Sequence, residues 1–282
     1  MTQTLLEVDD LRVAFPNRAG GWTEVVRGVS FTLGRERLGI VGESGSGKSQ
    51  TGRAILGLTA PGARVTARRL AFNGIDLLGT GPQERRARTG LRGGRIAMVL
   101  QDPQFSLNPV LRIGDQIVET LRAHRRVSRT DARCQALAAL AQVQIDEPER
   151  VYRLYPHQLS GGMCQRAMLA MALIAQPELL IADEPTSALD VSVQLQVLAL
   201  LDTLVAQRGM GLVLVSHDLR LVSRFCDRIL VMYAGRVVEA LPAGGLAQAQ
   251  HPYTQGLLHC LPQLGASRHP LPTLQRQAEW AL

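Results

Sequence analysis

One short stretch of the chain combines glycines, a lysine and a serine at a spacing suited to phosphate chemistry. Residues 42–49 read GESGSGKS, which matches the pattern GxxxxGK(S/T). Glycines let backbone N–H groups converge on phosphates, which Lys48 would also reach, and the Ser49 hydroxyl would ligate Mg²⁺. A purely structural glycine-rich turn is the alternative. The phosphate-binding residues predicted here are Gly42, Ser44, Gly45, Ser46, Gly47, Lys48 and Ser49.

The lysine of this stretch is unusual in the whole chain. Lys48 is the only lysine among 31 basic residues, and all the others are arginines. An ammonium is a compact point charge, whereas a guanidinium is a planar fork. Its position in the phosphate-binding pattern indicates that this site requires the compact charge, with drift in base composition as the alternative.

Two acids follow an apolar run that predicts a buried strand at residues 179–184 (LLIADE). Next to a phosphate-binding loop, Asp183 would hold the Mg²⁺ shell. Glu184 would lie near the γ-phosphate, where a carboxylate can activate the attacking water. Taken alone, the pattern fits a strand with a capping acid equally well. Together the two motifs indicate a nucleotide hydrolase.

A second anion-binding turn is predicted at residues 159–163 (LSGGM), which we call the serine–glycine turn. Ser160 is suited to cap the helix that follows. Gly161 and Gly162 would leave bare N–H groups at the positive end of the helix dipole. An ordinary helix cap is the alternative interpretation.

In this combination and order, the motifs resemble those of the ATP-binding cassette family. The order is phosphate loop, Gln101 after a strand, LSGGM, the acid pair, residues 187–190 (SALD), and His217 after a strand. The resemblance covers about residues 5–240. It implies ATP and Mg²⁺ as ligands and the pairing of two cassettes head to tail.

The resemblance also implies a role for each further residue. The serine–glycine turn, Ser160, Gly161 and Gly162, would close over the nucleotide held by the partner cassette. Gln101 would touch Mg²⁺ or the lytic water, and Asp190 would lie where the cassettes meet. His217 would bond the γ-phosphate, unless it is only a satisfied histidine at a strand end. Phe15 would stack on adenine, unless it is a core residue, and Gln50 would complete the nucleotide site.

The pattern of apolar residues predicts an α/β fold. Short apolar runs at 37–42, 95–100, 179–184, 211–217 and 228–235 are typical of buried strands, and helices are expected at 49–58, 161–175 and 191–208. Alternating segments at 5–15 and 25–33 predict half-buried strands, and Asn73-Gly74 predicts a hairpin turn. From about residue 241, five prolines predict loop.

Together with the resemblance, these elements predict a nucleoside-triphosphatase fold with a phosphate-binding loop. The predicted parts of this fold are a RecA-like parallel sheet, an antiparallel β subdomain and an inserted helical subdomain. The predicted core comprises residues 1–101 and 167–240. Helical periodicity, clearest at 131–143, predicts the helical signature subdomain at 102–166. Residues 241–282 form a C-terminal extension.

The composition of the chain limits which partners and which cellular compartment are expected. The net charge is +7, but the arginines are dispersed, and solvated helix faces explain their densest groups as well as a nucleic-acid surface does. Four cysteines without metal spacing fit a reducing cytosol. The N-terminus lacks the features of a signal peptide, and no run is long enough to span a bilayer. A membrane role would therefore depend on partner proteins.

Two further segments indicate a branch of the family. Residues 101–109 (QDPQFSLNP) and 251–258 (HPYTQGLL) resemble the ATPase subunits of oligopeptide, dipeptide and nickel importers. An arbitrary Pro-Tyr turn is the alternative for the second segment. Cys164 stands where arginine is common in that branch, which alters the surroundings of the signature. Many relatives carry several cysteines for an iron–sulfur cluster near the end, whereas this chain has only Cys260 there, so we predict no cluster.

The resemblance implies an energy-coupling subunit at the cytoplasmic face of the inner membrane. Its partners would be a second ATPase subunit, identical or homologous, two membrane permease subunits, and indirectly a periplasmic or extracellular solute-binding protein. The solute would be a peptide, nickel or a metal chelate. The alternatives are an efflux ATPase and a soluble ATPase acting on nucleic acid or ribosomes, although we expect no nucleic-acid partner.

Overall fold

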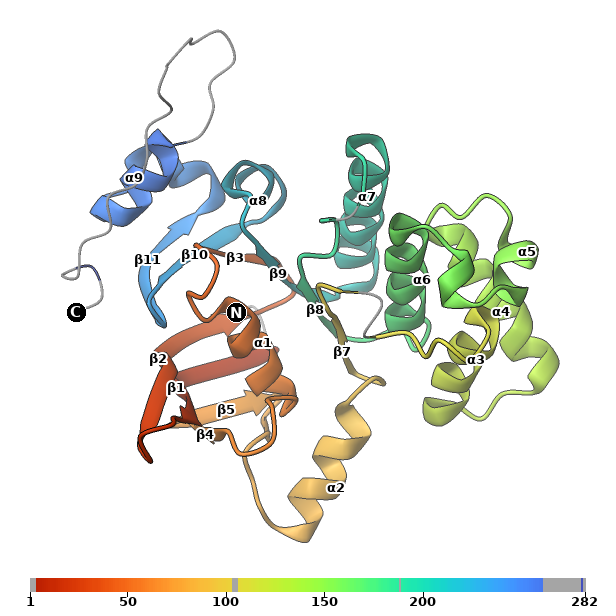
Figure 1. Cartoon of the computed structure of the whole chain (residues 1–282), viewed down its shortest axis with the longest axis horizontal. Coiled ribbons are helices and arrows are strands. Elements are labelled where there is room, and N and C mark those ends of the chain that lie inside the picture. The colour runs from red at the N-terminus through yellow and green to blue at the C-terminus, as the bar shows by residue number, and fades with distance from the viewer. Residues whose placement is uncertain (1–3, 103–105, 188, 261–279, 281–282) are drawn as a thin grey trace, which may run out of the picture. The chain divides into compact units, whose positions relative to one another are not determined.

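The computed structural model describes residues 4–102, 106–187, 189–260 and 280 (Figure 1). These residues cluster into two compact units. The helical unit contains described residues of 4–5, 34–36 and 75–213. The phosphate-loop unit contains 6–33, 37–74 and the described residues from 214 onward.

An antiparallel sheet opens the phosphate-loop unit. Alternation of apolar and polar residues buries one face of its long strands, as predicted, and Val13, Val26 and Leu33 are fully buried. A turn in which Asn73 and Gly74 both have positive φ follows the sheet, as the Asn-Gly pair predicts. The strands are β1 (Leu6–Pro16), β2 (Trp22–Leu33), β4 (Arg64–Thr66) and β5 (Arg69–Phe72), in which β1 pairs with the other three, and β6 (Ile75–Asp76) follows the turn.

A parallel pair of strands carries the phosphate loop in the same unit. β3 (Arg37–Val41) pairs in parallel with β10 (Arg228–Tyr233), which pairs in antiparallel with β11 (Arg236–Pro242). Gly39 lets helix α8 (Leu219–Phe225) approach β3, because a Cβ at this position would lie 2.0 Å from Val222. Helix α1 (Lys48–Leu56) begins directly after the loop and ends at Gly57, which has the left-handed conformation that terminates helices.

The helical unit combines a parallel strand pair with most of the helices. β7 (Ile96–Val99) pairs in parallel with β8 (Leu179–Asp183), whose five residues are all buried. β9 (Gly211–Ser216) contributes residues to both units. The helices are α2 (Pro82–Leu91), α3 (Ile113–His124), α4 (Arg129–Gln142), α5 (Pro148–Arg153), the 3₁₀ helix η2 (Pro156–Gln158), α6 (Gly161–Leu173) and α7 (Val191–Arg208).

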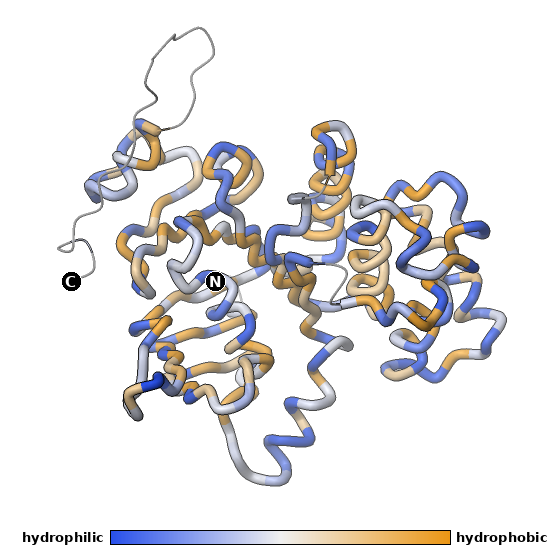
Figure 2. Tube along the Cα trace, in the orientation of Figure 1, coloured by the Kyte–Doolittle hydropathy of each residue, from blue (hydrophilic) through white to orange (hydrophobic). Residues whose placement is uncertain are grey.

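The helices of this unit follow their apolar spacing. Ile113, Ile117 and Leu121 lie four residues apart on α3 and are buried, and α3, α5 and α6 all contact α4. In contrast, α2 buries only Leu91 and is hydrophilic along most of its length (Figure 2). Its arginines therefore cover a solvated helix face, which agrees with the interpretation of the clustered basic residues.

The prediction of loop beyond residue 241 is wrong for the described residues. The 3₁₀ helix η3 (Ala243–Gln248) follows β11, and helix α9 (Pro252–His259) follows η3. Proline at the first position of a helix is favourable because its missing N–H has no partner there in any case. Pro252 therefore starts a helix, and His251 caps it by accepting a hydrogen bond at Nδ1 from the Tyr253 N–H at 3.2 Å.

Candidate functional site

The loop that connects β3 to α1 encloses the only lysine of the chain. Lys48 is 6% exposed, and its ammonium donates hydrogen bonds to the carbonyl oxygens of Gly42 at 2.7 Å and Glu43 at 2.8 Å. It also lies 3.4 Å from the Ser46 hydroxyl. A buried cation satisfied by several oxygens fits a compact ammonium, as the sequence predicts.

The glycines of this loop are required by its backbone. Gly42, Gly45 and Gly47 all have positive φ. A Cβ at Gly42 would lie 2.1 Å from the Met232 carbonyl oxygen, and a Cβ at Gly47 would lie 2.6 Å from the Val25 carbonyl oxygen. Both obstacles are backbone atoms, so neither can move aside cheaply. The chain thus forms the tight cradle that a phosphate-binding loop needs.

The outer side of the loop is supported by the turn between β10 and β11. The Gly235 N–H donates to the Ser46 carbonyl oxygen at 3.1 Å, and the Gly235 carbonyl oxygen accepts from the Arg27 N–H at 2.7 Å. A cavity of about 170 Å³ is lined by residues 43–46 with Tyr233 and Ala234. The predicted residues 42–49 therefore form one connected structure.

The residues predicted to hold Mg²⁺ offer the oxygen donors that this ion prefers. Ser49, the second residue of α1, is half-buried. The adjacent Gln50 has a buried side-chain oxygen, Oε1, without a hydrogen-bond partner among the described residues, so it is available to a ligand. In the helical unit, Asp183 ends β8 and is 1% exposed. Serine hydroxyl and carboxylate oxygens are each suited to a hard divalent cation, although no three His, Cys, Asp or Glu side chains gather at one place among the described residues.

The predicted base, Glu184, is held by three neighbouring side chains. Gln101 donates from Nε2 to the Glu184 carboxylate at 3.0 Å, which brings together two of the predicted site residues. Glu184 has a φ of 49°. This uncommon backbone conformation costs energy and is concentrated at functional sites. The side chains of Gln165 and Ser187 fix that backbone by donating to the Glu184 carbonyl oxygen at 3.0 and 3.1 Å.

The serine–glycine turn begins helix α6. The Ser160 hydroxyl accepts from the Met163 N–H at 3.3 Å, so the predicted cap is present. Ser160 and Gly161 are exposed, Gly162 is partly exposed, and a Cβ at Gly161 would meet nothing within 4 Å. Cys164 is 5% exposed and donates to the Pro156 carbonyl oxygen, and burial raises the pKa of its thiol. It therefore faces the interior of the unit.

The remaining predicted residues lie at the surface. Asp190 caps α7 by accepting from the Ser192 and Val193 N–H groups at 3.0 Å each, and the Ser192 hydroxyl, followed by the Val193 N–H, holds the pKa of its carboxyl below the usual value. His217 follows β9 and is exposed. Phe15 is half-buried at the end of β1, so it is not one of the fully enclosed core residues.

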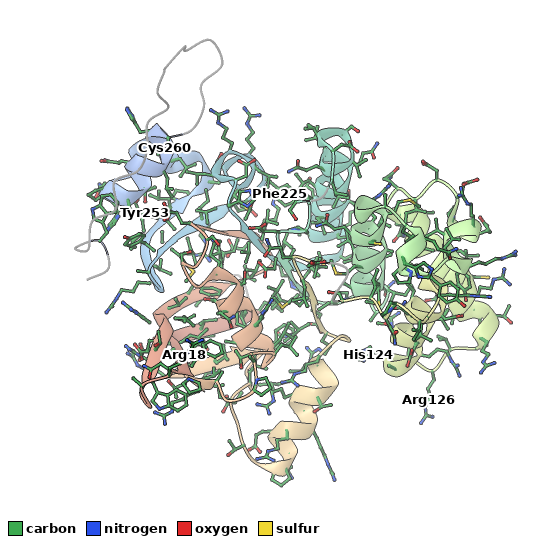
Figure 3. All side chains as sticks on the ribbon, viewed as in Figure 1. Arg18, His124, Arg126, Phe225, Tyr253 and Cys260 are labelled. Carbon is green, nitrogen blue, oxygen red and sulfur yellow. The ribbon has the colours of Figure 1, made fainter. Side chains whose placement is uncertain are left out.

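Two residues of the site were missed by sequence reasoning. Gln165 is 1% exposed although its side chain is polar, and an amide within the apolar run that follows LSGGM was the available signal. Tyr253, on α9 (Figure 3), accepts a hydrogen bond from the Glu43 N–H at 3.0 Å. The HPYT segment drew attention to Tyr253 only as a marker of a branch, because a contact between residues 210 positions apart has no local signature.

No helix in the described part of the chain is both long and apolar enough to cross a membrane. The prediction that the chain holds no iron–sulfur cluster concerns a C-terminal region that lies largely outside the described residues. Ala188 of the SALD segment and residues 103–105 of the QDPQFSLNP segment also lie outside the described residues.

Known proteins resemble this chain in sequence and in fold. A family model described as "ABC transporter" matches residues 26–187. The oligopeptide transport ATP-binding protein OppD of Salmonella typhimurium is 46% identical over 92% of this chain and 77% of its own length. The dipeptide transport ATP-binding protein DppD of Bacillus subtilis is 44% identical over 95% of this chain and 81% of its own length.

Solved structures of ABC transporter cassettes also resemble this chain. The dimeric bacterial ABC transporter cassette MJ0796 superposes with a TM-score of 0.77 at 28% identity, covering 86% of this chain and all of that chain. The same cassette in a post-hydrolysis state bound to ADP and phosphate gives a TM-score of 0.76. The predicted cassette fold is therefore confirmed, and the relatives give no support to an efflux pump or a nucleic-acid ATPase.

Proposed function

The chain belongs to the ABC transporter family and is an ATPase of that type, and we propose that it powers the uptake of peptides through partner membrane subunits. The observation that carries the proposal is a complete phosphate loop around a buried Lys48, in a chain that is 46% identical to peptide-transport ATPases. The names of the relatives favour peptides over nickel or metal chelates as the solute.

The proposed nucleotide site begins with the phosphate loop. Residues 42–47 offer backbone N–H groups and Lys48 offers its ammonium to the β- and γ-phosphates. Ser49, Gln101 and Asp183 would hold Mg²⁺ or its water ligands, with Gln50 beside them, and the ion would neutralise charge on the phosphates. Phe15, half-buried at the end of β1, would stack on the adenine ring.

The proposed chemistry is hydrolysis by an activated water. Glu184 accepts a proton from water while the water oxygen bonds to the γ-phosphorus, and the bond from that phosphorus to the bridging oxygen of ADP breaks. Gln101, which donates to the Glu184 carboxylate, orients this base. His217 would donate to the γ-phosphate. Most of the catalysis would come from positioning and from stabilisation of charge.

The proposed working unit contains two cassettes. Ser160, Gly161 and Gly162 would face the γ-phosphate of the nucleotide held by the other cassette, and Asp190 would lie next to the contact. The exposed serine–glycine turn and the dimeric form of the solved relative support this arrangement. The second cassette would be an identical or homologous ATPase subunit.

We propose further that two permease subunits bind this pair at the cytoplasmic face of the membrane, so that the chain is a peripheral protein. A solute-binding protein outside the membrane would deliver the peptide to those permeases. The motion caused by ATP binding and hydrolysis would pass from the helical signature subdomain to the permeases. Co-purification of these subunits with the tagged chain tests the assembly.

Substitution of the proposed base tests the chemistry. Glu184→Gln should reduce ATP turnover of the purified transport complex by about 10²–10⁴-fold, because the amide cannot accept the proton. Binding of ATP, measured by equilibrium dialysis, should persist. Glu119→Gln, an exposed position on α3, is the matched control and should keep full turnover. Undiminished turnover by Glu184→Gln would disprove the assignment of the base.

A further inference from the structure

The side chain of Tyr253 contacts the phosphate loop. Tyr253, on α9, is fully buried, and its hydroxyl accepts the hydrogen bond from the Glu43 N–H at 3.0 Å. Figure 3 labels Tyr253 on this helix, which lies in the same compact unit as the loop. Loss of the Tyr253 hydroxyl would therefore remove a part-buried hydrogen bond from the backbone of the loop.

Glu43, whose N–H donates to Tyr253, also accepts a hydrogen bond from Lys48. The Glu43 carbonyl oxygen and the preceding Gly42 carbonyl oxygen both accept from the Lys48 ammonium. Gly42 has a φ of 153°, and the Met232 carbonyl lies where its Cβ would be, so the backbone before Glu43 has little freedom. The peptide units around Glu43 are thus anchored by Tyr253 at the nitrogen and by Lys48 at the oxygens.

Tyr253 has a fixed position of its own. Its ring centroid lies 4.5 Å from that of Tyr233, on β10, and 5.9 Å from that of Trp280. The start of α9 is tied to β11, because the Glu239 carboxylate accepts from the N–H groups of Gln250 at 2.6 Å and His251 at 3.3 Å. The Tyr253 ring is therefore packed against β10, and the start of the helix that carries it is anchored to β11.

We propose that Tyr253 is a positioning residue of the nucleotide site and that α9 responds to nucleotide binding through it. Lys48 shares its three N–H groups between the loop carbonyls and the phosphates of a bound nucleotide, so the position of the Glu43 peptide influences its affinity for phosphate. Coupling between two sites is reciprocal. Nucleotide bound at the loop therefore stabilises α9 as much as a correctly placed α9 favours nucleotide. This inference rests on the proposed role of residues 42–49.

The test uses the full-length chain and two measurements. In Tyr253→Phe the ring contacts remain and only the hydroxyl is lost. The Kd for a fluorescent ATP derivative should rise by about 3–10-fold, which corresponds to the weakening of one hydrogen bond. In hydrogen exchange, ATP should slow exchange in α9 of the wild-type chain, and this effect should disappear in the variant. A purely structural role would lower the thermal midpoint without changing either readout.

Two further variants make the result decisive. Tyr152→Phe removes a phenol hydroxyl from α5 of the helical unit and should leave the Kd unchanged. Lys48→Ala should abolish binding. If Lys48→Ala binds like the wild type, the role of the loop itself fails and the inference fails with it. If Lys48→Ala loses binding while Tyr253→Phe keeps the wild-type Kd and the protection of α9, the coupling through Tyr253 alone is disproved.

Discussion

The phosphate loop and the serine–glycine turn both place a serine and glycines at the start of a helix, yet they differ in almost every physical property. The phosphate loop encloses its own cation, and its Gly42 and Gly47 have positive φ and are crowded by backbone carbonyls. The serine–glycine turn is exposed, has no such crowding at Gly161, and keeps an ordinary serine cap.

This difference distinguishes glycines that the backbone of the chain requires from glycines that would allow another molecule to approach the backbone closely. At Gly42 and Gly47 of the phosphate loop the chain itself requires glycine, since a Cβ at either position would collide with a backbone oxygen of the same unit. At Gly161 a Cβ would meet nothing within 4 Å, so the proposed reason for glycine there is a close contact with a ligand or a partner. Substitutions to alanine can test this distinction directly.

The largest effect is expected in the phosphate loop. Gly42→Ala should lower the free energy of unfolding by more than about 2 kcal/mol, because the methyl group collides with a carbonyl oxygen at an unfavourable φ. ATP binding should be lost. Chemical denaturation measures the unfolding free energy, and equilibrium dialysis measures ATP binding. A variant that is as stable as the wild type and still binds ATP would contradict the crowding at Gly42.

Gly161→Ala should separate stability from turnover. Because the site is open and alanine favours helix over glycine, the unfolding free energy should stay the same or rise by up to about 1 kcal/mol. Turnover of the assembled transporter should fall by about tenfold or more, since the methyl group would obstruct a close contact with the partner's nucleotide. Gly90→Ala, another open glycine on α2, is the control. Equal turnover in the two variants would contradict a role for this turn.

Ser160 allows the cap to be separated from the ligand contact. Ser160→Ala should cost about 1 kcal/mol of stability through loss of the cap. Ser160→Asp should restore that stability because aspartate caps equally well, but its negative charge should repel the γ-phosphate and keep turnover low. If Ser160→Asp restores both, the residue is an ordinary helix cap.

The smallest effect concerns the strand that leads to the phosphate loop. Arg37, at the start of β3, donates to Asp227 through its side chain and its N–H, which holds the pKa of the Asp227 carboxyl below its usual value. A depressed pKa contributes stability above the unfolded value of about 3.9, and the contribution is lost as pH falls through the folded pKa.

Asp227→Asn should therefore destabilise the chain at pH 7 by no more than about 1 kcal/mol, because the Asp227 side chain is 41% exposed. The variant should also lose less stability than the wild type on acidification below pH 4. Denaturation at several pH values measures both. Identical pH profiles would show that the pair does not contribute.

Local chemistry explains which elements could be predicted from the sequence. The apolar run before the loop became β3, the helix at 191–208 became α7 with the same bounds, and LSGGM provided the cap of α6. Each depends on neighbours within a few residues. The motifs assigned Gln101 and Glu184 to the same nucleotide site, but the hydrogen bond between their side chains was not predicted and is seen only in the structure.

The parts that could not be predicted depend on contacts between distant residues. Helix α9 begins at a proline in a proline-rich segment, and its Tyr253 reaches the phosphate loop. Gln165 contacts the Glu184 backbone from another helix. The amide of Gln165 within an apolar run marks that residue as unusual, but no local pattern identifies the partner of either Gln165 or Tyr253, because each partner is distant in the sequence.

Cross-linking from the serine–glycine turn tests whether this turn reaches the phosphate loop of another cassette. Gly161→Cys would be combined with Glu184→Gln and with Cys134→Ser and Cys260→Ser, because Cys134 is exposed and Cys260 is partly exposed. A reagent with one thiol-reactive and one photoreactive end would be attached to this cysteine. Mixed light and ¹⁵N-labelled chains would be cross-linked with and without Mg²⁺–ATP, and mass spectrometry would identify the cross-linked residues and chains. If the turn closes over the nucleotide of a partner cassette, an ATP-dependent cross-link to the phosphate loop of another cassette chain is expected. Cross-links confined to the same chain, or independent of ATP, would contradict it.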